Sequence, residues 1–142
     1  MYRQDAAPDR SILVTAFNAT IFGIDRATGE IRWTVSDVFT GGILELALEE
    51  DVLIAASSEK LGFVEYATGR VLAVVDIEGE HPRRPTMLVA DGHVYIGRNG
   101  ELSCYTTRGQ RVWYQPFHLK GFGSMALALP GIVRQADDIG GR

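Results

Sequence analysis

Cysteine is almost absent from this sequence of 142 residues, and long apolar runs are missing. The single cysteine, Cys104, excludes an intrachain disulfide and a metal site built from several thiolates, and we expect it to be a small buried hydrophobe. No segment approaches the ~20 consecutive apolar residues of a membrane helix, and residues 1–5 lack the apolar stretch of a secretory signal. We therefore expect a cytoplasmic protein without membrane insertion, or a periplasmic one if a signal peptide has been removed.

An excess of basic residues is missing as well. The chain has 14 lysines and arginines against 18 aspartates and glutamates, and its formal net charge is -4. A protein with this balance has no overall field that attracts it to nucleic acid or to an anionic membrane. Nucleic acid is therefore not an expected partner.

Motifs with a known chemistry are not found either. His81, His93 and His118 are far apart and do not have the spacing of metal ligands. The sequence contains no Gly-x-Ser-x-Gly motif, no phosphate-binding loop and no dinucleotide fingerprint. We expect a protein without catalytic residues, without a cofactor and without a metal site.

Strand-forming segments separated by turns begin at Ser11, in a chain whose 46% hydrophobic residues suffice for a core. β-Branched and aromatic residues fill 12–17 and 20–25, and residues 30–35 alternate between polar and apolar. Gly29 stands where a turn needs the positive φ that other residues resist. These three segments are expected to form an antiparallel sheet.

This turn returns forty and eighty residues later. Thr28-Gly29 is followed by Thr68-Gly69 and by Gly109, and Trp33 is followed by Ala73 and by Trp113. The strand patterns return with the turn, at 52–56, 61–66 and 70–75 and at 93–97, 101–105 and 110–114, with leading strands at 43–48 and 86–90. Propensity alone leaves a helix open for 43–50, but a repeat at a fixed period favours strands. Four short antiparallel strands in about 40 residues are typical of a β-propeller blade, so the sequence predicts an all-β fold with about three blades.

The repeat resembles the PQQ-like repeat of quinoprotein-type β-propellers, whose blades end in a pattern close to Asp-x-x-Thr-Gly-x-x-x-Trp. The first repeat matches with Asp25, Thr28, Gly29 and Trp33, while the second keeps only Thr68 and Gly69 and the third only Gly109 and Trp113. The resemblance implies that both tryptophans are core residues docked between blades. It does not extend to cofactor binding, because this chain has three repeats and one cysteine where such enzymes have a fuller ring and often a vicinal cysteine pair.

The predicted strands do not divide evenly into blades of four. Residues 1–10 are expected to form a flexible arm. The three blades are expected to cover about 11–42, 43–82 and 83–124. Extra strands are expected at 125–135, followed by a polar tail at 136–142. The first blade lacks its leading strand, because Arg3 to Pro8 cannot form a buried strand, whereas Met125 to Leu129 is a surplus strand.

We expect the surplus strand, with Met125, Leu127 and Leu129, to complete the blade begun by Ser11 to Val35 of a second copy. Unpaired strand edges favour such exchange, and three blades are too few to close a ring. Two copies in head-to-tail contact then form a six-bladed ring. An open helical stack, a short capping helix, or docking on a different protein remain alternatives.

The loops at 38–42, 78–85 and 117–124 occupy equivalent places, so they are expected to share one face. They carry a locally basic set of residues flanked by aromatic rings: Phe39, His81, Arg83, Arg84, His118, Lys120 and Phe122. Such a surface suits an acidic or phosphorylated partner segment, although the sequence favours ordinary solvated loops as the explanation. The sequence favours a non-catalytic scaffold that self-assembles and binds proteins; the alternative is a sensor that binds a ligand or peptide on these loops.

Overall fold

The computed structural model describes residues 8–40, 43–79, 82–118 and 120–136. Most of the predicted N-terminal arm, His81 and most of the C-terminal tail therefore lie outside the described residues. The described chain is built entirely from β-strands and turns, and none of its parts is a helix that could cross a membrane. Its strands are β1 (Ile12–Phe17), β2 (Thr20–Asp25), β3 (Ile31–Val35), β4 (Glu45–Glu49), β5 (Val52–Ala56), β6 (Lys60–Glu65), β7 (Val71–Asp76), β8 (Thr86–Ala90), β9 (His93–Arg98), β10 (Glu101–Thr106), β11 (Arg111–Gln115), β12 (Leu127–Leu129) and β13 (Ile132–Arg134).

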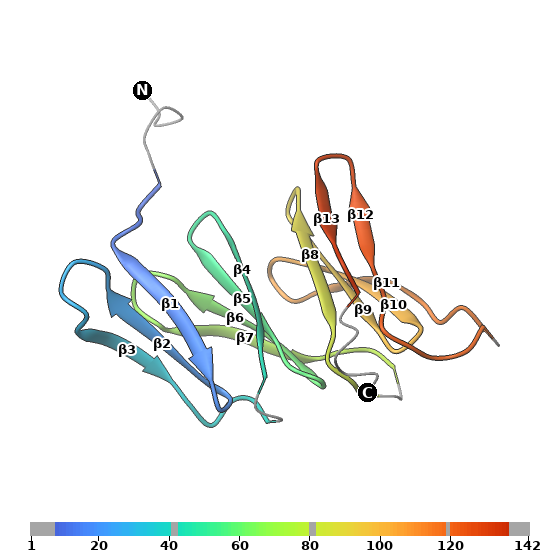
Figure 1. Cartoon of the computed structure of the whole chain (residues 1–142), viewed down its shortest axis with the longest axis horizontal. Helices are drawn as coiled ribbons and strands as arrows, with labels where there is room; N and C mark the ends of the chain where they lie inside the picture. Colours follow the sequence, from blue (N-terminus) through green and yellow to red (C-terminus); the bar gives the residue numbers. More distant parts are fainter. Residues whose placement is uncertain (1–7, 41–42, 80–81, 119, 137–142) are drawn as a thin grey trace.

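Consecutive strands pair antiparallel to form three blades that stand side by side (Figure 1). Blade 1 contains β1–β3, blade 2 contains β4–β7, and blade 3 contains β8–β11, while β12 and β13 form a separate hairpin. The predicted all-β fold with propeller-type blades is confirmed, and the segment 43–50 contains a strand and no helix. Blade 1 has three strands where blades 2 and 3 have four, so the described sheets do not close into a ring.

The turn between β2 and β3 is held by the side chain of Asp25. Its carboxylate accepts hydrogen bonds from the backbone N–H groups of Ala27 (2.9 Å) and Thr28 (3.1 Å), and the N–H of Gly29 donates to the Asp25 carbonyl. Gly29 has φ +82°, in the left-handed region that favours glycine. The equivalent Gly69 and Gly109 have φ +77° and +88°, which confirms the predicted tight turn in all three repeats.

These turns predict a loss of stability in acid. Hydrogen bonds from Ala27 and Thr28 lower the pKa of Asp25, and the Thr68 hydroxyl lowers the pKa of Glu65. A carboxyl group with a lowered pKa stabilises the folded state above its ordinary pKa and loses that contribution as the pH falls through the lowered value. We expect the melting temperature to be constant from neutral pH to about pH 5 and to fall below it.

Circular dichroism at constant ionic strength measures this change. Asp25→Asn keeps an oxygen that accepts the same hydrogen bonds but does not titrate, so its melting temperature is expected to fall less steeply in acid than that of the unaltered chain. Parallel acid profiles for the two proteins would contradict the role of Asp25.

Two apolar cores lie between the blades. The core between blades 1 and 2 contains Trp33, which is only 8% exposed and donates a hydrogen bond from Nε1 to the Tyr66 carbonyl (2.9 Å). A Cβ atom on Gly69 of blade 2 would lie 2.6 Å from the Trp33 ring, and one on Gly23 of blade 1 would lie 2.2 Å from it. The indole is therefore held between two glycines, as predicted for a core residue.

The core between blades 2 and 3 ends at a buried arginine. The Arg98 guanidinium donates to the carbonyls of Ser58 (2.6 Å), Ile77 (3.4 Å) and Glu78 (3.2 Å), all in loops of blade 2 or leading out of it. Desolvation lowers the pKa of Arg98, and the charge of Glu101 opposes this effect. Arg98 thus joins the end of β9 to the loops of the neighbouring blade.

Candidate functional site

The first open feature is the edge of β1. The Tyr66 hydroxyl accepts a hydrogen bond from the Ile12 N–H (2.9 Å) and donates one to the Ile12 carbonyl (2.6 Å), so these backbone groups point away from β2. Because the direction alternates along an antiparallel pair, the backbone groups of Val14 and Ala16 point to the same side. No described strand pairs with that edge. Blade 1 thus lacks its leading strand within the described residues, and Tyr66 closes only the first position of the edge.

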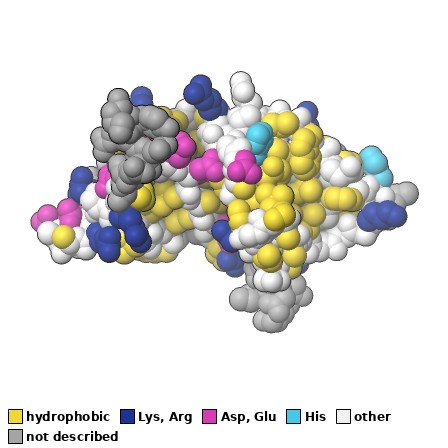
Figure 2. All heavy atoms as spheres, turned by 90° about the horizontal axis from the view of Figure 1, so that it is seen from above, with side chains coloured by type: hydrophobic (Ala, Val, Ile, Leu, Met, Phe, Trp, Pro, Cys, Tyr) yellow, Lys and Arg dark blue, Asp and Glu magenta, His cyan; other side chains and the backbone are white. Residues whose placement is uncertain are grey.

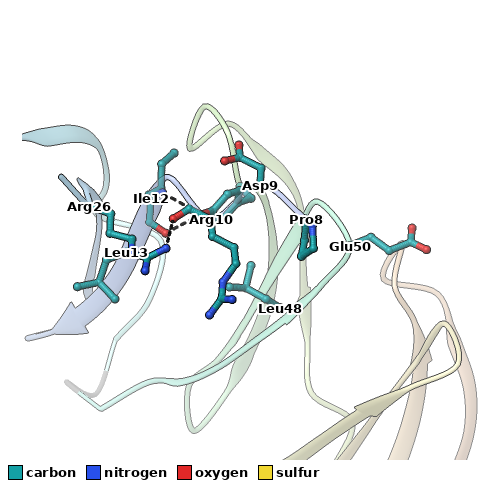
Figure 3. A pocket seen from close by; sticks show the side chains of 9 residues that line it. Pro8, Asp9, Arg10, Ile12, Leu13, Arg26, Leu48 and Glu50 are labelled. Carbon is teal, nitrogen blue, oxygen red and sulfur yellow. Dashed lines mark hydrogen bonds between the residues drawn. The ribbon is translucent and has the colours of Figure 1, made fainter. Parts of the chain in front are cut away.

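A cavity of about 550 Å³ lies beside this edge, between blade 1 and the turn that joins β4 to β5. Figure 3 shows the Arg10 side chain extending between Leu13 of β1 and Leu48 of β4. Leu48 is 52% exposed, and Glu50 and Arg26 supply charges at the rim. This is an open, partly apolar hollow at the place where a leading strand would end.

The outer face of blade 1 is uncovered as well. Leu13 holds the position in β1 that Leu53 holds in β5, yet Leu13 is 61% exposed and Leu53 is fully buried. Phe17 is 64% exposed and stacks on Phe22 with ring centroids 5.4 Å apart. The burial differs because a blade precedes blade 2, whereas none of the described residues covers this side of blade 1.

The far face of blade 3 is the second open end. Trp113 is 41% exposed, so the prediction that it is a core residue is wrong in this structure. The reason is that no full blade of the described chain covers the indole, which lies against Tyr95 with ring centroids 6.2 Å apart. An apolar groove of about 180 Å³ runs beside it, lined by Leu88, Tyr95, Leu102, Trp113, Leu127, Ala128 and Leu129. Seen from above, hydrophobic side chains gather on the half of the molecule that carries β8 to β13 (Figure 2).

The β12–β13 hairpin lies against β8 and covers part of this face. A Cβ atom on Gly97 would lie 3.3 Å from Leu127 Cδ2, whereas Val133 is 55% exposed. The repeat predicts that Val133 faces blade 3 and Leu127 faces away from it. The reason is that Leu53, eighty residues before Val133, faces the preceding blade. The hairpin is therefore turned over relative to a regular blade. The predicted strand from Met125 is also shorter, since Met125 precedes β12 and β12 pairs with β13 of the same chain.

The predicted loop surface is only partly assembled. Phe39 is 5% exposed and lies over Gly62, so it is a core residue and not part of a binding surface. Arg84 forms an ion pair with Glu45 (2.8 Å). Asn99 accepts hydrogen bonds from Arg83 (3.3 Å) and from the Gly123 N–H (2.9 Å), and so links two of the three loops. A shallow hollow nearby is lined in part by Phe117, His118 and Phe122, and Lys120 is exposed beside it.

The next features are the possible metal ligands and the single thiol. No group of three or more His, Cys, Asp or Glu residues there could hold a metal ion. Cys104 is 1% exposed, and burial raises the pKa of its thiol, which fits the expected buried hydrophobe.

No protein-family model and no curated protein matches the chain, but solved structures resemble it. The computationally designed Ika8 protein matches 93% of the chain at 19% identity with a TM-score of 0.68, and the chain covers 42% of it. BamB from Moraxella catarrhalis matches 91% at 19% identity with a TM-score of 0.65, and the chain covers 41% of it. The quinohemoprotein alcohol dehydrogenase ADHIIG from Pseudomonas putida HK5 matches 81% at 17% identity with a TM-score of 0.58, and the chain covers 19% of it.

At these identities the likeness concerns the fold alone. It agrees with a propeller fold of the PQQ-like repeat type. The chain spans about two fifths of Ika8 and of BamB, so it corresponds to a segment of those folds.

Proposed function

We propose that the chain is a non-catalytic propeller scaffold that joins proteins through its two open ends, and that a second copy of the chain is the first partner. One comparison carries this proposal. Leu13 and Trp113 are exposed, whereas Leu53 and Trp33 are buried at the equivalent positions where two blades meet. The open ends thus offer the two complementary halves of an interface that the chain already forms twice within itself.

The unpaired edge of β1 is the place for the strand exchange that the sequence predicts. In blade 2, Glu49 at the end of the leading strand pairs with Val52. The repeat period of forty places Leu129 at the position of Glu49, two repeats later, and Ile12 at the position of Val52, one repeat earlier. In the exchanged pair, Leu129 would therefore lie opposite Ile12. The same register places Leu127 opposite Val14 and Met125 opposite Ala16. These two positions are the ones that Tyr66 leaves unoccupied. Edge strands of this kind bind an added strand through backbone hydrogen bonds.

Light scattering during size-exclusion chromatography tests the proposal. We expect the mass to rise with protein concentration to about 31 kDa, twice the 15.6 kDa of one chain, as for a closed two-copy ring. Leu13→Lys places a charge on the outer face of blade 1 and is expected to keep the protein monomeric. Leu72→Lys, at a 45% exposed position on the outermost strand of blade 2, is the matched control.

A mass of one chain at every concentration would reject self-assembly. An unlimited rise with concentration would replace the closed ring by an open stack.

A ligand- or peptide-binding sensor is the second candidate, and the hollow beside His118 favours it. Asn99 brings the loops of Arg83 and Gly123 together there. Saturable binding of an acidic peptide that is lost in Arg83→Ala while the mass of the assembly is unchanged would support this function over the scaffold.

A further inference from the structure

We propose that Trp113 of one copy docks on the Gly29 turn of a second copy, with its indole N–H donating to the Arg26 carbonyl. The inference rests on the proposed self-assembly and names the contact that closes it. On the second copy, the contact surface is the turn from Asp25 to Gly29 together with the outer face of blade 1. On the first copy, it is the face of blade 3 that carries Trp113 and Tyr95.

The chain contains a complete example of this contact. Trp33 on the outermost strand of blade 1 lies on Gly69 in the turn of blade 2, and its Nε1 donates to the Tyr66 carbonyl, three residues before that glycine. The next junction repeats the arrangement with a smaller residue: a Cβ atom on Gly109 of blade 3 would lie 3.7 Å from Ala73 of blade 2. In both junctions the outermost strand of one blade covers the turn glycine of the next blade.

The two halves left over are complementary. Gly29 has the same left-handed conformation as Gly69 and Gly109, but no atom of the described residues beyond its chain neighbours lies within 4 Å of a Cβ atom built on it. Trp113 is the tryptophan at the position of Trp33, and it is 41% exposed. One end of the chain therefore has an uncovered turn glycine, and the other has a tryptophan without a turn to cover.

The surroundings of these two halves agree with a second copy as the occupant. Blade 3 contributes Leu88, Tyr95 and Leu102 to the surface beside Trp113. The outer face of blade 1 presents Leu13 and the stacked rings of Phe17 and Phe22. A tryptophan that is buried at the centre of an apolar contact and has a partner for its N–H is a typical hot spot of binding. The forty-residue period places Trp113 and Gly29 at the positions that Trp33 and Gly69 hold within the chain, so a second copy supplies the matching half.

Two substitutions test the contact, and each removes one of its two sides. Trp113→Ala removes the indole, and Gly29→Asn fills the space above the turn with a residue that tolerates a positive φ. Each is expected to raise the dissociation constant of the two-copy assembly by about thirtyfold or more, measured by analytical ultracentrifugation. Gly92→Asn is the control, because Gly92 also has a positive φ (+76°) and none of the described residues beyond its chain neighbours lies within 4 Å of a Cβ atom built on it. Circular dichroism checks that all three variants are folded.

Mixing the two variants tests the direction of the contact. The Gly29→Asn protein retains Trp113, and the Trp113→Ala protein retains Gly29, so a mixed pair regains one of the two junctions in the ring. We expect the mixture to associate more tightly than either variant alone.

The outcomes separate this inference from the proposed function. If the unaltered chain assembles and both variants assemble equally well, the Trp113 contact is wrong while self-assembly stands. A mixture that associates no better than its components would likewise overturn the head-to-tail contact. If the unaltered chain stays monomeric, the proposed function fails first, and the inference fails with it.

Discussion

Replacing Trp33 by alanine is expected to lower the free energy of unfolding by about 3–5 kcal/mol, the usual cost of truncating a large buried aromatic residue. The indole fills the space between Gly23 and Gly69, and neither glycine has a side chain that could fill the cavity. The substitution also leaves the Tyr66 carbonyl without its donor. Urea denaturation at a concentration where the chain is monomeric measures the change.

Trp113→Ala is the matched comparison for this prediction. The same residue type is removed at the equivalent repeat position, but the side chain is 41% exposed instead of 8%. Its effect on the monomer is expected to be less than half that of Trp33→Ala, because little apolar contact is lost. Equal losses for the two variants would mean that the junction between blades 1 and 2 does not depend on the buried indole.

The second large effect is expected for Arg98→Met. Methionine fills much of the same volume but donates no hydrogen bonds, so the carbonyls of Ser58, Ile77 and Glu78 lose their common donor. Leaving buried acceptors unpaired typically costs about 1–3 kcal/mol each, and we expect a total loss of about 3 kcal/mol because part of this site is rehydrated. Urea denaturation again measures the change.

Arg98→Lys serves as the control, because a single ammonium group retains the charge but cannot span three carbonyls. An intermediate stability is expected for it. If Arg98→Met were as stable as the unaltered chain, the guanidinium would not hold blade 2 to blade 3.

The turns and the blades could be predicted from the sequence because their causes are local. Asp25 and Gly29 lie within one turn, where a carboxylate reaches the backbone two and three residues on and a glycine takes a positive φ. The fixed period then carried this assignment to Gly69 and Gly109. The same period favoured a strand over a helix for residues 43–50, because the strand pattern at the equivalent positions of the other repeats outweighs the local helical propensity.

The features of the candidate site depend on distant residues, and the repeat does not encode them. Tyr66 caps Ile12 from 54 positions away, and no pattern near either residue indicates the contact. Trp113 matches Trp33 in sequence, but its burial depends on whether another blade packs against blade 3. Phe39 lies in a loop by sequence and in the core by structure, because Gly62 on the neighbouring blade leaves room for its ring.

The orientation of the β12–β13 hairpin has a consequence for the speed of assembly. If β12 were the leading strand of a fourth blade, Ala128 would face blade 3, but in the hairpin Leu127 faces it. One edge of β12 is also already paired with β13. Three residue pairs must therefore open and the strand must rotate before β12 can join a second copy. Association that requires such a rearrangement is slower than simple docking of preformed surfaces. A freshly diluted or freshly concentrated sample would then reach its equilibrium mass with a lag, so for a time its mass would still reflect the concentration from which it came.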